Sequence, residues 1–394
     1  MNLNSSSADK EIGFPRVCIK CIYDEGVNGI TFDNKGMCNY CQMIEDLNLK
    51  YETGTEKGIV SFERIIQKIR KSGRGKKYDV IVGVSGGTDS SYMLHLARLY
   101  NLRVLAVHYD NTWNSAIATE NIRKMTSALD IDLFTHVCDN KESDDIFRSF
   151  FLASVPEIDG PTDIALAEVM YRAAAKYGLK YILEGHSFNA EGVSPLGTAY
   201  VDGGYIADIH RRFGRQSMKT FPNMSFAKFL YWTIFKRIQR VRPFWYLDYS
   251  KQSARALLES EYNWTYYGGH HLENRMTAFH HSFYTPRKFG LDQRNNSLSA
   301  SVRSGELSRE EALVEFAKPP LVEEEIVEYV MKRFDMVPEE FQTTMDLPRK
   351  YYTDYKTYKK RFERTQPLFY VLARFNLVPW SFYLKYCFPR KKNK

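Results

Sequence analysis

The sequence predicts an α/β protein with a doubly wound parallel sheet, preceded by a zinc ribbon and followed by a mainly helical region. Three observations support this prediction. Strand and helix patterns alternate between residues 78 and 183, a Gly-Gly turn follows the first strand, and two Cys-x-x-Cys pairs lie near the N-terminus. The predicted segments are a four-cysteine ribbon at 14–45, a helical connector at 46–77, a nucleotide domain at 78–265 with an insertion at about 194–240, and a C-terminal substrate or partner region at 266–394.

The composition is that of an ordinary globular protein, with 394 residues of which 44% are hydrophobic and 26% charged. No apolar stretch approaches the roughly 20 residues of a membrane span, and the polar start of the chain lacks the apolar region of a signal peptide. We therefore expect a cytoplasmic protein with no membrane span. The net charge of +8 is modest and does not choose between a nucleotide, a sugar nucleotide and RNA.

Four of the six cysteines form two Cys-x-x-Cys pairs, Cys18 with Cys21 and Cys38 with Cys41, separated by sixteen residues. Each pair can place two thiolates on one edge of a tetrahedron, and the glycine-rich segment between them can turn the chain back. We therefore expect a structural zinc ion with four thiolate ligands. Two disulfides are the weaker alternative, because a cytoplasmic compartment keeps thiols reduced.

Strands and helices are expected to alternate after the connector. Apolar runs predict strands at 78–84, 103–109, 133–137 and 181–183, and helical patterns lie between and after them near 89–100, 115–129, 144–153 and 163–177. Ser308 with Glu311 predicts a capped helix start. The aromatic, basic segment from residue 346 onward is expected to pack as helices onto the core, and contact with a nucleic acid or a membrane surface is the alternative.

The turn between the first strand and the first helix is the expected phosphate site. Two adjacent glycines allow a tight turn and leave no side chain over an anion, while the N–H groups of the first helical turn face it. The string lacks the Gly-Lys-Ser/Thr ending of a Walker loop and instead resembles the SGGxDS signature of the PP-loop ATP pyrophosphatases. A Gly-Gly turn without a ligand is the alternative. The loop comprises Val84, Ser85, Gly86, Gly87, Thr88, Asp89 and Ser90.

Polar residues follow the ends of the second and fourth strands, where ligands bind in such sheets. At the second strand, His108, Asp110 and the following aromatic residue Trp113 could receive the adenine, and an ordinary Asp-Asn turn is the alternative. At the fourth, Glu184-Gly185-His186 resembles the Gly-His stretch of PP-loop enzymes. We expect Glu184 and His186 to contact substrate or metal, although strand-end histidines are as often structural.

Two cations complete the expected nucleotide site. Arg242, followed by a proline, and Lys251, preceded by a serine, resemble the Arg-Pro and Ser-Lys element that follows the last strand of PP-loop domains. Both are expected to lie near the phosphates.

A second polar cluster lies beyond residue 266, where four of the nine histidines fall within twelve residues. A second metal site is one interpretation. We favour a site for an anionic sugar, because an arginine repels a metal ion and attracts carboxylate or phosphate. The candidate substrate residues are His271, Glu273, Arg275, Lys288, Asp292 and Arg294.

These motifs together resemble the N-acetyl sugar amidotransferase family over nearly the whole chain. The resemblance implies an enzyme of bacterial lipopolysaccharide, O-antigen or flagellar-glycan synthesis that uses ATP and Mg²⁺ to turn an acetamido group into an acetamidino group. It also implies ammonia from a HisH-like glutaminase working with a HisF-like protein. Ser85, Asp89, Glu184 and His186 are the expected catalytic residues.

Two other functions remain open. A PP-loop enzyme of tRNA thiolation would need a persulfide cysteine or an iron-sulfur cluster, and only Cys138 and Cys387 remain beyond the ribbon. A nucleotide-binding sensor without turnover is weaker still. We therefore expect an N-acetyl sugar as the substrate and no nucleic-acid partner.

Overall fold

The computed structural model describes residues 16–193, 200–268 and 273–388. A five-stranded, all-parallel sheet in the order β3-β2-β1-β4-β5 lies at its centre. The expected doubly wound α/β fold is thereby confirmed. The strands are β1 (Val80–Gly83), β2 (Val104–Asp110), β3 (Asp132–Val137), β4 (Tyr181–Leu183) and β5 (Gln239–Val241).

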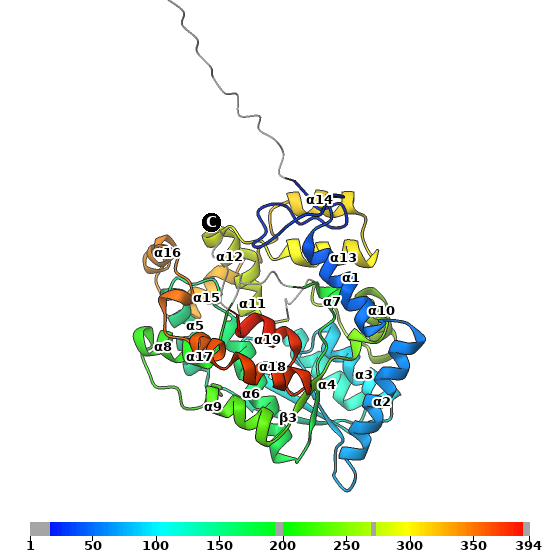
Figure 1. Cartoon of the computed structure of the whole chain (residues 1–394). Coiled ribbons are helices and arrows are strands. Elements are labelled where there is room, and N and C mark those ends of the chain that lie inside the picture. The colour runs from blue at the N-terminus through cyan, green and yellow to red at the C-terminus, as the bar shows by residue number, and fades with distance from the viewer. Residues whose placement is uncertain (1–15, 194–199, 269–272, 389–394) are drawn as a thin grey trace, which may run out of the picture.

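Helices cover both faces of the sheet, and each face has its own hydrophobic core (Figure 1). Alternate residues of a strand point to opposite faces, so Val80 and Val82 of β1 belong to one core and Ile81 to the other. The helices that supply the first core are α2 (Glu56–Ser72), α3 (Thr88–Leu99), α4 (Ala116–Ala128) and α10 (Lys251–Tyr262).

The second core is larger, because it joins the sheet to the C-terminal helices. Its sheet-covering helices are α5 (Asn140–Leu152) and α6 (Gly160–Lys176), and α8 (Gly203–Phe213) and α9 (Phe226–Leu230) extend it. The remaining elements that pack into it are α11 (Arg275–Phe279), the π-helical turns η1 (Tyr231–Phe235) and η3 (His280–Tyr284), α12 (Thr285–Phe289), α15 (Ile326–Phe334), α16 (Pro338–Asp346), η4 (Tyr352–Asp354), α17 (Lys359–Arg364), α18 (Gln366–Arg374) and α19 (Trp380–Tyr386).

The N-terminal segment carries α1 (Asn39–Tyr51) and lies against α13 (Arg294–Ser304) and α14 (Arg309–Ala317) at the top of Figure 1. Two short elements, α7 (Phe188–Glu191) and the 3₁₀ turn η2 (Pro243–Trp245), follow β4 and β5. The predicted cap of α14 is confirmed, since Ser308 and Glu311 form a reciprocal capping box. None of the helices in the described ranges is long and apolar enough to cross a bilayer.

The element boundaries differ from the predictions in three places. Helix α5 begins four residues earlier than expected, because the Asp139 side chain accepts a hydrogen bond from the Glu142 N–H and caps it. Helix α1 begins at Asn39 and crosses the boundary placed between ribbon and connector. Strand β5 lies at the end of the expected insertion and was not predicted, since three residues among cations carry no apolar pattern.

Candidate functional site

The loop between β1 and α3 has the geometry of an anion cradle. Gly86 has a φ of +82°, and a Cβ there would lie 2.1 Å from the carbonyl oxygen of Ala118. Gly87 caps α3 without a side-chain hydrogen bond, and a Cβ there would lie 2.9 Å from Glu273 Oε1. The first turn of α3 therefore opens toward the cavity, and neither glycine places a side chain over its N–H groups.

Hydroxyl groups hold the loop in shape. The Ser85 N–H donates to Ser90 Oγ at 3.2 Å, and Ser90 Oγ donates to the Gly87 carbonyl at 3.1 Å. Tyr267, which belongs to none of the expected binding residues, accepts a hydrogen bond from the Thr88 N–H at 3.3 Å. Ser85, Thr88, Ser90 and Tyr267 thus surround the position that the predicted phosphate would take.

Lys251 lies among carboxylates at the mouth of the loop. Its Nζ is 3.1 Å from Asp89 Oδ2, and Asp89 also accepts a hydrogen bond from the Tyr249 hydroxyl. Burial alone would lower the pKa of Lys251, but Asp89, Glu191 and Glu273 together outweigh burial and raise that pKa. Lys251 is therefore a stable cation beside the loop, and its contact with phosphate stays a prediction.

The same carboxylates fit the expected Mg²⁺. Asp89 and Glu273 line the cavity beside the phosphate loop, and Mg²⁺ is commonly held by one or two carboxylates together with substrate phosphates. When bound there, Mg²⁺ would neutralise charge on those phosphates.

Glu184 is engaged by two arginines at the end of β4. It forms ion pairs with Arg240 and with Arg242, whose Nε lies 3.1 Å from Glu184 Oε2. Burial tends to raise the pKa of Glu184, but the two guanidinium groups outweigh it and lower that pKa. Glu184 thus stays ionised and orients both arginines along the cavity wall, while its catalytic role stays a prediction.

His186 is a half-buried, neutral histidine beside Glu184, Arg240 and Arg242. Burial, helped by the charge of Arg242, lowers its pKa to about 3. The indole N–H of Trp245 donates to His186 Nδ1 at 3.2 Å, so the ring proton is on Nε2. His186 can therefore donate a hydrogen bond in the cavity at neutral pH, but it does not exchange protons there.

Two half-buried histidines predict a loss of stability in acid. Burial lowers the pKa of His186 to about 3 and that of His280 to about 4. Below about pH 6.5 the unfolded chain binds protons that the folded chain does not, so the free energy of unfolding falls with pH, by up to about 5 kcal/mol in total down to pH 4.5. Urea unfolding at several pH values measures this slope. His280→Gln should flatten it by about half, and an unchanged slope would contradict the assignment.

The expected adenine site at the end of β2 is closed by protein. His108 Nδ1 donates to the Val84 carbonyl at 2.8 Å, and its Nε2 lies 3.0 Å from the Asn114 amide nitrogen. Asp110 accepts the Thr112 N–H in a turn, and Trp113 is fully buried. The chain around residue 274 bridges to residue 114 over this edge. The prediction that Trp113 forms an aromatic wall for the adenine is therefore wrong, because Trp113 belongs to the core. Asp110 fits the alternative interpretation of an ordinary Asp-Asn turn.

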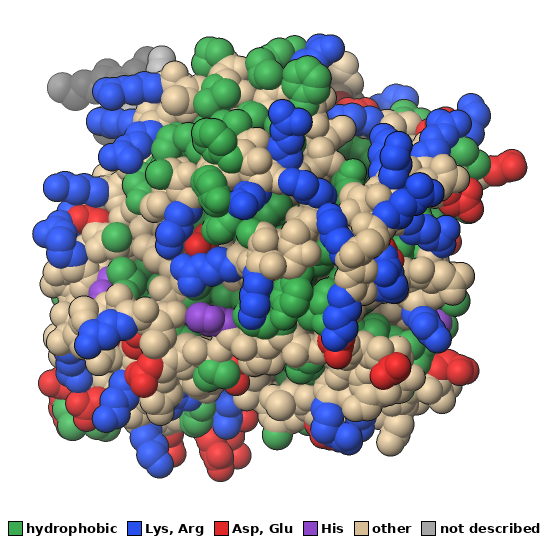
Figure 2. Space-filling model, turned by 90° about the horizontal axis from the view of Figure 1, so that it is seen from below, with side chains coloured by type: hydrophobic (Ala, Val, Ile, Leu, Met, Phe, Trp, Pro, Cys, Tyr) green, Lys and Arg blue, Asp and Glu red, His purple; other side chains and the backbone are tan. Residues whose placement is uncertain are grey.

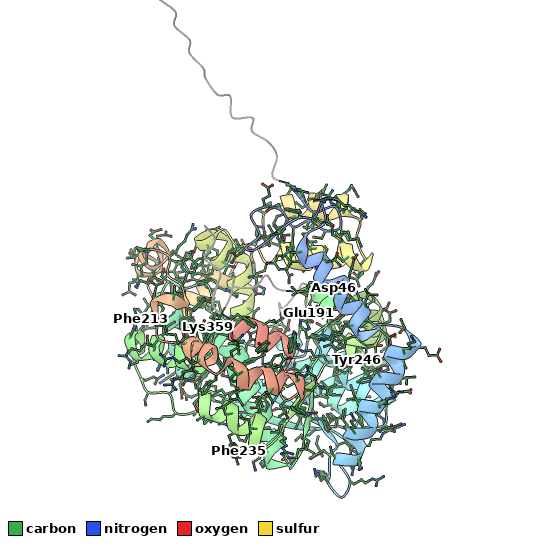
Figure 3. All side chains as sticks on the ribbon, viewed as in Figure 1. Asp46, Glu191, Phe213, Phe235, Tyr246 and Lys359 are labelled. Carbon is green, nitrogen blue, oxygen red and sulfur yellow. The ribbon has the colours of Figure 1, made fainter. Side chains whose placement is uncertain are left out.

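The cavity instead extends past β4 and β5 to the C-terminal helices. It has a volume of about 1000 Å³, at the upper end of the usual range for ligand sites. Its far end is lined by aromatic residues and by Lys385 of α19. Burial lowers the pKa of Lys385, while Asp163 and Glu157 oppose this effect. Figure 3 labels Glu191, which also lines the cavity. The aromatic residues of the far end are Tyr171, Phe226, Phe229, Tyr358, Phe362, Phe382 and Tyr386.

Sequence reasoning missed most of this far end, because its residues come from separate helices and share no local motif. Arg255, beside Lys251, was also missed, although helical spacing could have found it. It lies one turn after Lys251 on α10, so helical spacing places both on one face. Its guanidinium stacks on Tyr266, 3.5 Å from the ring centroid, and Arg255 also lines the cavity.

The predicted sugar-binding cluster is dispersed by the fold. Of its members in the described ranges, only Glu273 lines the cavity, and His271 lies outside those ranges. Arg275 forms an ion pair with Glu323 at 2.7 Å and stacks over Tyr329. The substrate roles of His271 and Arg275 stay predictions.

Lys288, Asp292 and Arg294 hold the C-terminal helices together. Lys288 Nζ donates to the carbonyls of residues 344, 345 and 347 at the end of α16, at 2.7–3.0 Å. These three bonds use all the donors of a lysine. Asp292 orients Arg294, which donates to the carbonyls of Phe316 and Lys318 at the C-terminal end of α14. The structure thus shows helix-capping contacts for these residues, away from the cavity.

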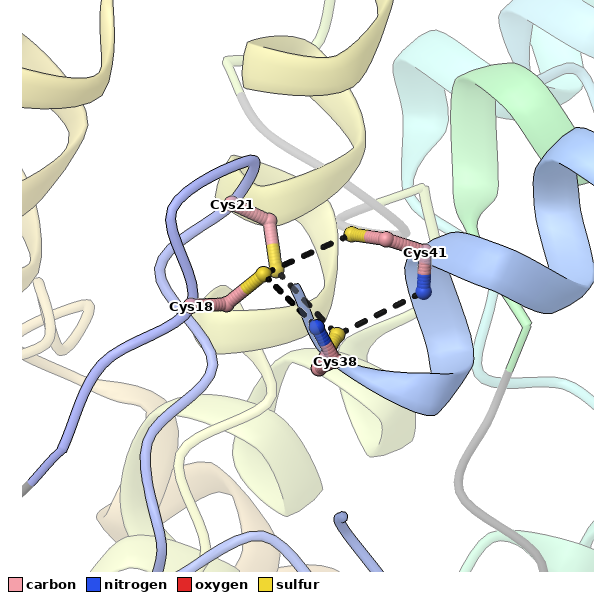
Figure 4. A group of neighbouring side chains, drawn as sticks. All are labelled: Cys18, Cys21, Cys38 and Cys41. Carbon is pink, nitrogen blue, oxygen red and sulfur yellow. Dashed lines mark hydrogen bonds between the residues drawn. The ribbon is translucent and has the colours of Figure 1, made fainter. Parts of the chain in front are cut away.

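The four ribbon cysteines converge on one point (Figure 4). Their Sγ atoms all lie within 4.8 Å of one another, with Cys18 and Cys41 at 3.8 Å and Cys21 and Cys38 at 3.9 Å. Zn–S bonds of about 2.3 Å in a tetrahedron place sulfurs about 3.8 Å apart. The cluster therefore fits a zinc ion with no open position, which is the arrangement of a structural site.

The ribbon connects to the cavity through α13. The Arg309 side chain donates to the carbonyl of Cys18 at 2.9 Å, and the Ile22 N–H donates to Ser299 Oγ of α13 at 3.3 Å. Asn296 accepts a hydrogen bond from the Tyr23 hydroxyl and donates to the carbonyl of Glu191, a residue that lines the cavity. The ribbon thus supports one wall of the site.

Comparisons with known proteins find separate matches for the sheet region with the glycine loop and for the C-terminal helical region. Residues 79–186 match the family model of the phosphoadenosine phosphosulfate reductase domain, and residues 273–368 match that of the LPS biosynthesis protein WbpG-like, C-terminal domain. Each match is a similarity of one region of the chain, and neither covers half of it. The PP-loop match includes the glycine loop and ends at His186, whereas the WbpG-like match begins at Glu273 and includes α13 to α17.

Whole-protein relatives are more distant. Uncharacterized protein MJ1599 of Methanocaldococcus jannaschii is 29% identical over 171 residues, which are 43% of this chain and 58% of that protein. The chain thus matches little more than half the length of this relative. Among solved structures, an NMN synthetase from Francisella tularensis is 13% identical over 73% of this chain and 95% of its own, and an NH3-dependent NAD synthetase from Campylobacter jejuni is 11% identical over 73% and 96%, both with a TM-score of 0.30.

Proposed function

We propose that this protein is an ATP-dependent, AMP-forming amidotransferase that converts the acetamido group of an N-acetyl sugar into an acetamidino group during bacterial surface-glycan synthesis. One observation carries the proposal. A single cavity joins the glycine loop of the PP-loop domain to residues of the WbpG-like domain, which belongs to a family named for LPS biosynthesis.

The proposed reaction has two steps. The acetamido oxygen attacks the α-phosphorus of ATP, and the bond to the β-phosphate oxygen breaks, releasing pyrophosphate. Ammonia then adds to the activated carbon, the C–O bond breaks, and AMP leaves with the oxygen. Activation is needed because an amide oxygen is otherwise a poor leaving group.

The residues of the site fit these steps. The loop N–H groups, with Ser85 and Ser90, would bind the departing pyrophosphate, and preorganised donors stabilise developing charge without reorganisation. Lys251 and Arg242 would lie beside the phosphates. His186, neutral and protonated on Nε2, would serve as a hydrogen-bond donor to the oxygen that becomes adenylated.

The nitrogen must come from elsewhere, and we extend the proposal to a HisH-like glutaminase acting with a HisF-like protein. Thiolation of tRNA is less well supported. Cys138 and Cys387 are both buried and neither lines the cavity, so no cysteine among the described residues is placed to carry a persulfide.

The test is a reaction with ATP, Mg²⁺, an ammonium salt and a panel of free and nucleotide-linked N-acetyl sugars, followed by mass spectrometry. Replacement of oxygen by NH lowers the product mass by about one unit, and we expect this change together with stoichiometric AMP. AMP formed only with tRNA would replace the proposal by thiolation, and ATP binding without any AMP would replace it by a nucleotide-binding role.

Lys385 gives a sharper prediction for the acceptor end. If the sugar carries a carboxylate or phosphate, Lys385→Met should raise the KM for the acceptor about tenfold, the scale of one charge-assisted hydrogen bond, and leave the Kd for ATP unchanged. Lys360→Met is a matched control, because Lys360 is an exposed lysine of the neighbouring helix α17. Equal acceptor KM values for both variants would rule out this role for Lys385.

A further inference from the structure

Helices α18 and α19 carry apolar side chains on their solvent-exposed faces as well as on their buried faces. One face of α18 is buried through Phe369, Leu372 and Ala373. Its outer face exposes Leu368 and Val371, three residues apart, and Phe375 follows four residues later with 70% of its surface exposed. This spacing places all three on one side of the helix.

Helix α19 repeats the pattern. Trp380, Leu384 and Phe388 are four residues apart and all are exposed, while Tyr383 and Cys387 face inward. The two rows meet where the rings of Tyr370 and Trp380 lie 5.9 Å apart. We call the continuous surface of Leu368, Tyr370, Val371, Phe375, Trp380, Leu384 and Phe388 the α18–α19 face. Contiguous exposed apolar surfaces of this kind usually mark an interaction site.

Charge is concentrated in the same part of the chain. The segment from residue 356 to the end contains eleven Lys and Arg and one Glu, so its net charge exceeds the +8 of the entire protein. Lys50 of α1 lies over the Trp380 ring, and Arg374 contacts the Tyr370 hydroxyl. Figure 2, which views the molecule from below, shows green hydrophobic side chains interspersed with blue Lys and Arg side chains on that side. The partner of such a surface must be anionic and must also accept aliphatic and aromatic side chains.

We propose that the α18–α19 face binds the surface of an anionic lipid bilayer. Trp and Tyr favour the boundary between headgroups and acyl chains, aliphatic and Phe side chains enter it, and cations attract anionic headgroups. A nucleic acid would use the cations and aromatic rings but leaves exposed aliphatic residues such as Val371 and Leu384 without a favourable partner.

The inner side of α19 gives this surface a functional position. Phe382, Lys385 and Tyr386 line the far end of the cavity, whereas Trp380 and Leu384 are exposed on the outside of the same helix. Binding to a bilayer would therefore place the far end of the cavity, at α19, next to the lipid surface. The inference does not depend on the reaction that the cavity catalyses.

The test is co-sedimentation of the purified full-length protein with vesicles of phosphatidylcholine containing about 30% phosphatidylglycerol, and with vesicles of phosphatidylcholine alone. We expect binding to the anionic vesicles, at least tenfold weaker binding to the neutral ones, and release by salt. Val371→Ser combined with Phe375→Ser should weaken binding at least tenfold. Formation of pyrophosphate should not change, because neither residue lines the cavity.

Val314→Ser is the matched control, since Val314 is also an exposed helical valine but lies on α14. Three outcomes would overturn the proposal. The first is equal vesicle binding by the double variant and by Val314→Ser. The second is that the wild-type protein binds an RNA oligonucleotide and not anionic vesicles. The third is that the wild-type protein binds no vesicles and is a dimer that the double variant converts to a monomer.

Discussion

Gly86→Ala is expected to abolish ATP-dependent pyrophosphate formation, with a loss of at least about 100-fold, or about 2.7 kcal/mol. Two physical effects combine there. The residue has a φ of +82°, which costs a non-glycine residue about 1–2 kcal/mol, and the added Cβ would lie 2.1 Å from the Ala118 carbonyl. The loop must therefore shift away from α4, and its N–H groups no longer converge on the phosphate. Release of pyrophosphate with an N-acetyl sugar panel is the measurement.

Gly75→Ala is the matched control, because it separates the cost of a positive φ from the clash of an added Cβ with the backbone. Gly75 also has a positive φ, of +73°, but nothing lies within 4 Å of a Cβ added there. It lies in the turn before β1, away from the cavity. We expect this variant to lose about 1 kcal/mol of stability and to keep its activity. If Gly86→Ala retained wild-type turnover, or if both variants lost activity equally, the glycine loop would not be the phosphate site.

Cys38→Ser is expected to remove most of the bound zinc and to lower the free energy of unfolding by several kcal/mol, about 3 or more. The free energy of metal binding contributes to folding, because the unfolded chain does not preform the site. The loss should extend beyond the ribbon, since Ile22 and Tyr23 hold Ser299 and Asn296 of α13, which supports a wall of the cavity. Metal analysis and thermal unfolding of the same preparations are the measurements.

Cys138→Ser is the control for this experiment, because Cys138 is an equally buried thiol that lies outside the cluster. It should keep its zinc and lose little stability. A Cys38→Ser protein with full zinc content and an unchanged melting temperature would contradict the structural-zinc assignment.

The nucleotide half of the site was predictable from the sequence because its signals are local. The glycines, the flanking strand and helix, and the cations Arg242 and Lys251 are recognisable as short patterns, and each lies where parallel strands end. The cysteine cluster was predictable for the same reason, since ligand spacing constrains the metal geometry.

The proposed acceptor half of the site was not predictable in the same way. A motif such as Lys288 with Asp292 and Arg294 has the same amino-acid sequence whether its charged side chains bind a ligand or cap helices. The distinction depends on which carbonyls come within hydrogen-bond distance of Lys288 and Arg294, and these belong to α16 and the end of α14. Lys385 could not be recognised either, because only the packing of α19 against α17 and α18 brings it to the cavity.

The sequence by itself determined the alternation of strands and helices, the glycine loop and the cysteine cluster, because hydrophobic periodicity, glycine geometry and cysteine spacing act over a few residues. Only the tertiary structure decided the direction of the cavity, the closure of the β2 edge, the capping roles of Lys288 and Arg294, and the exposure of the α18–α19 face. Each of these depends on contacts between residues far apart in the chain, and such contacts leave no local pattern.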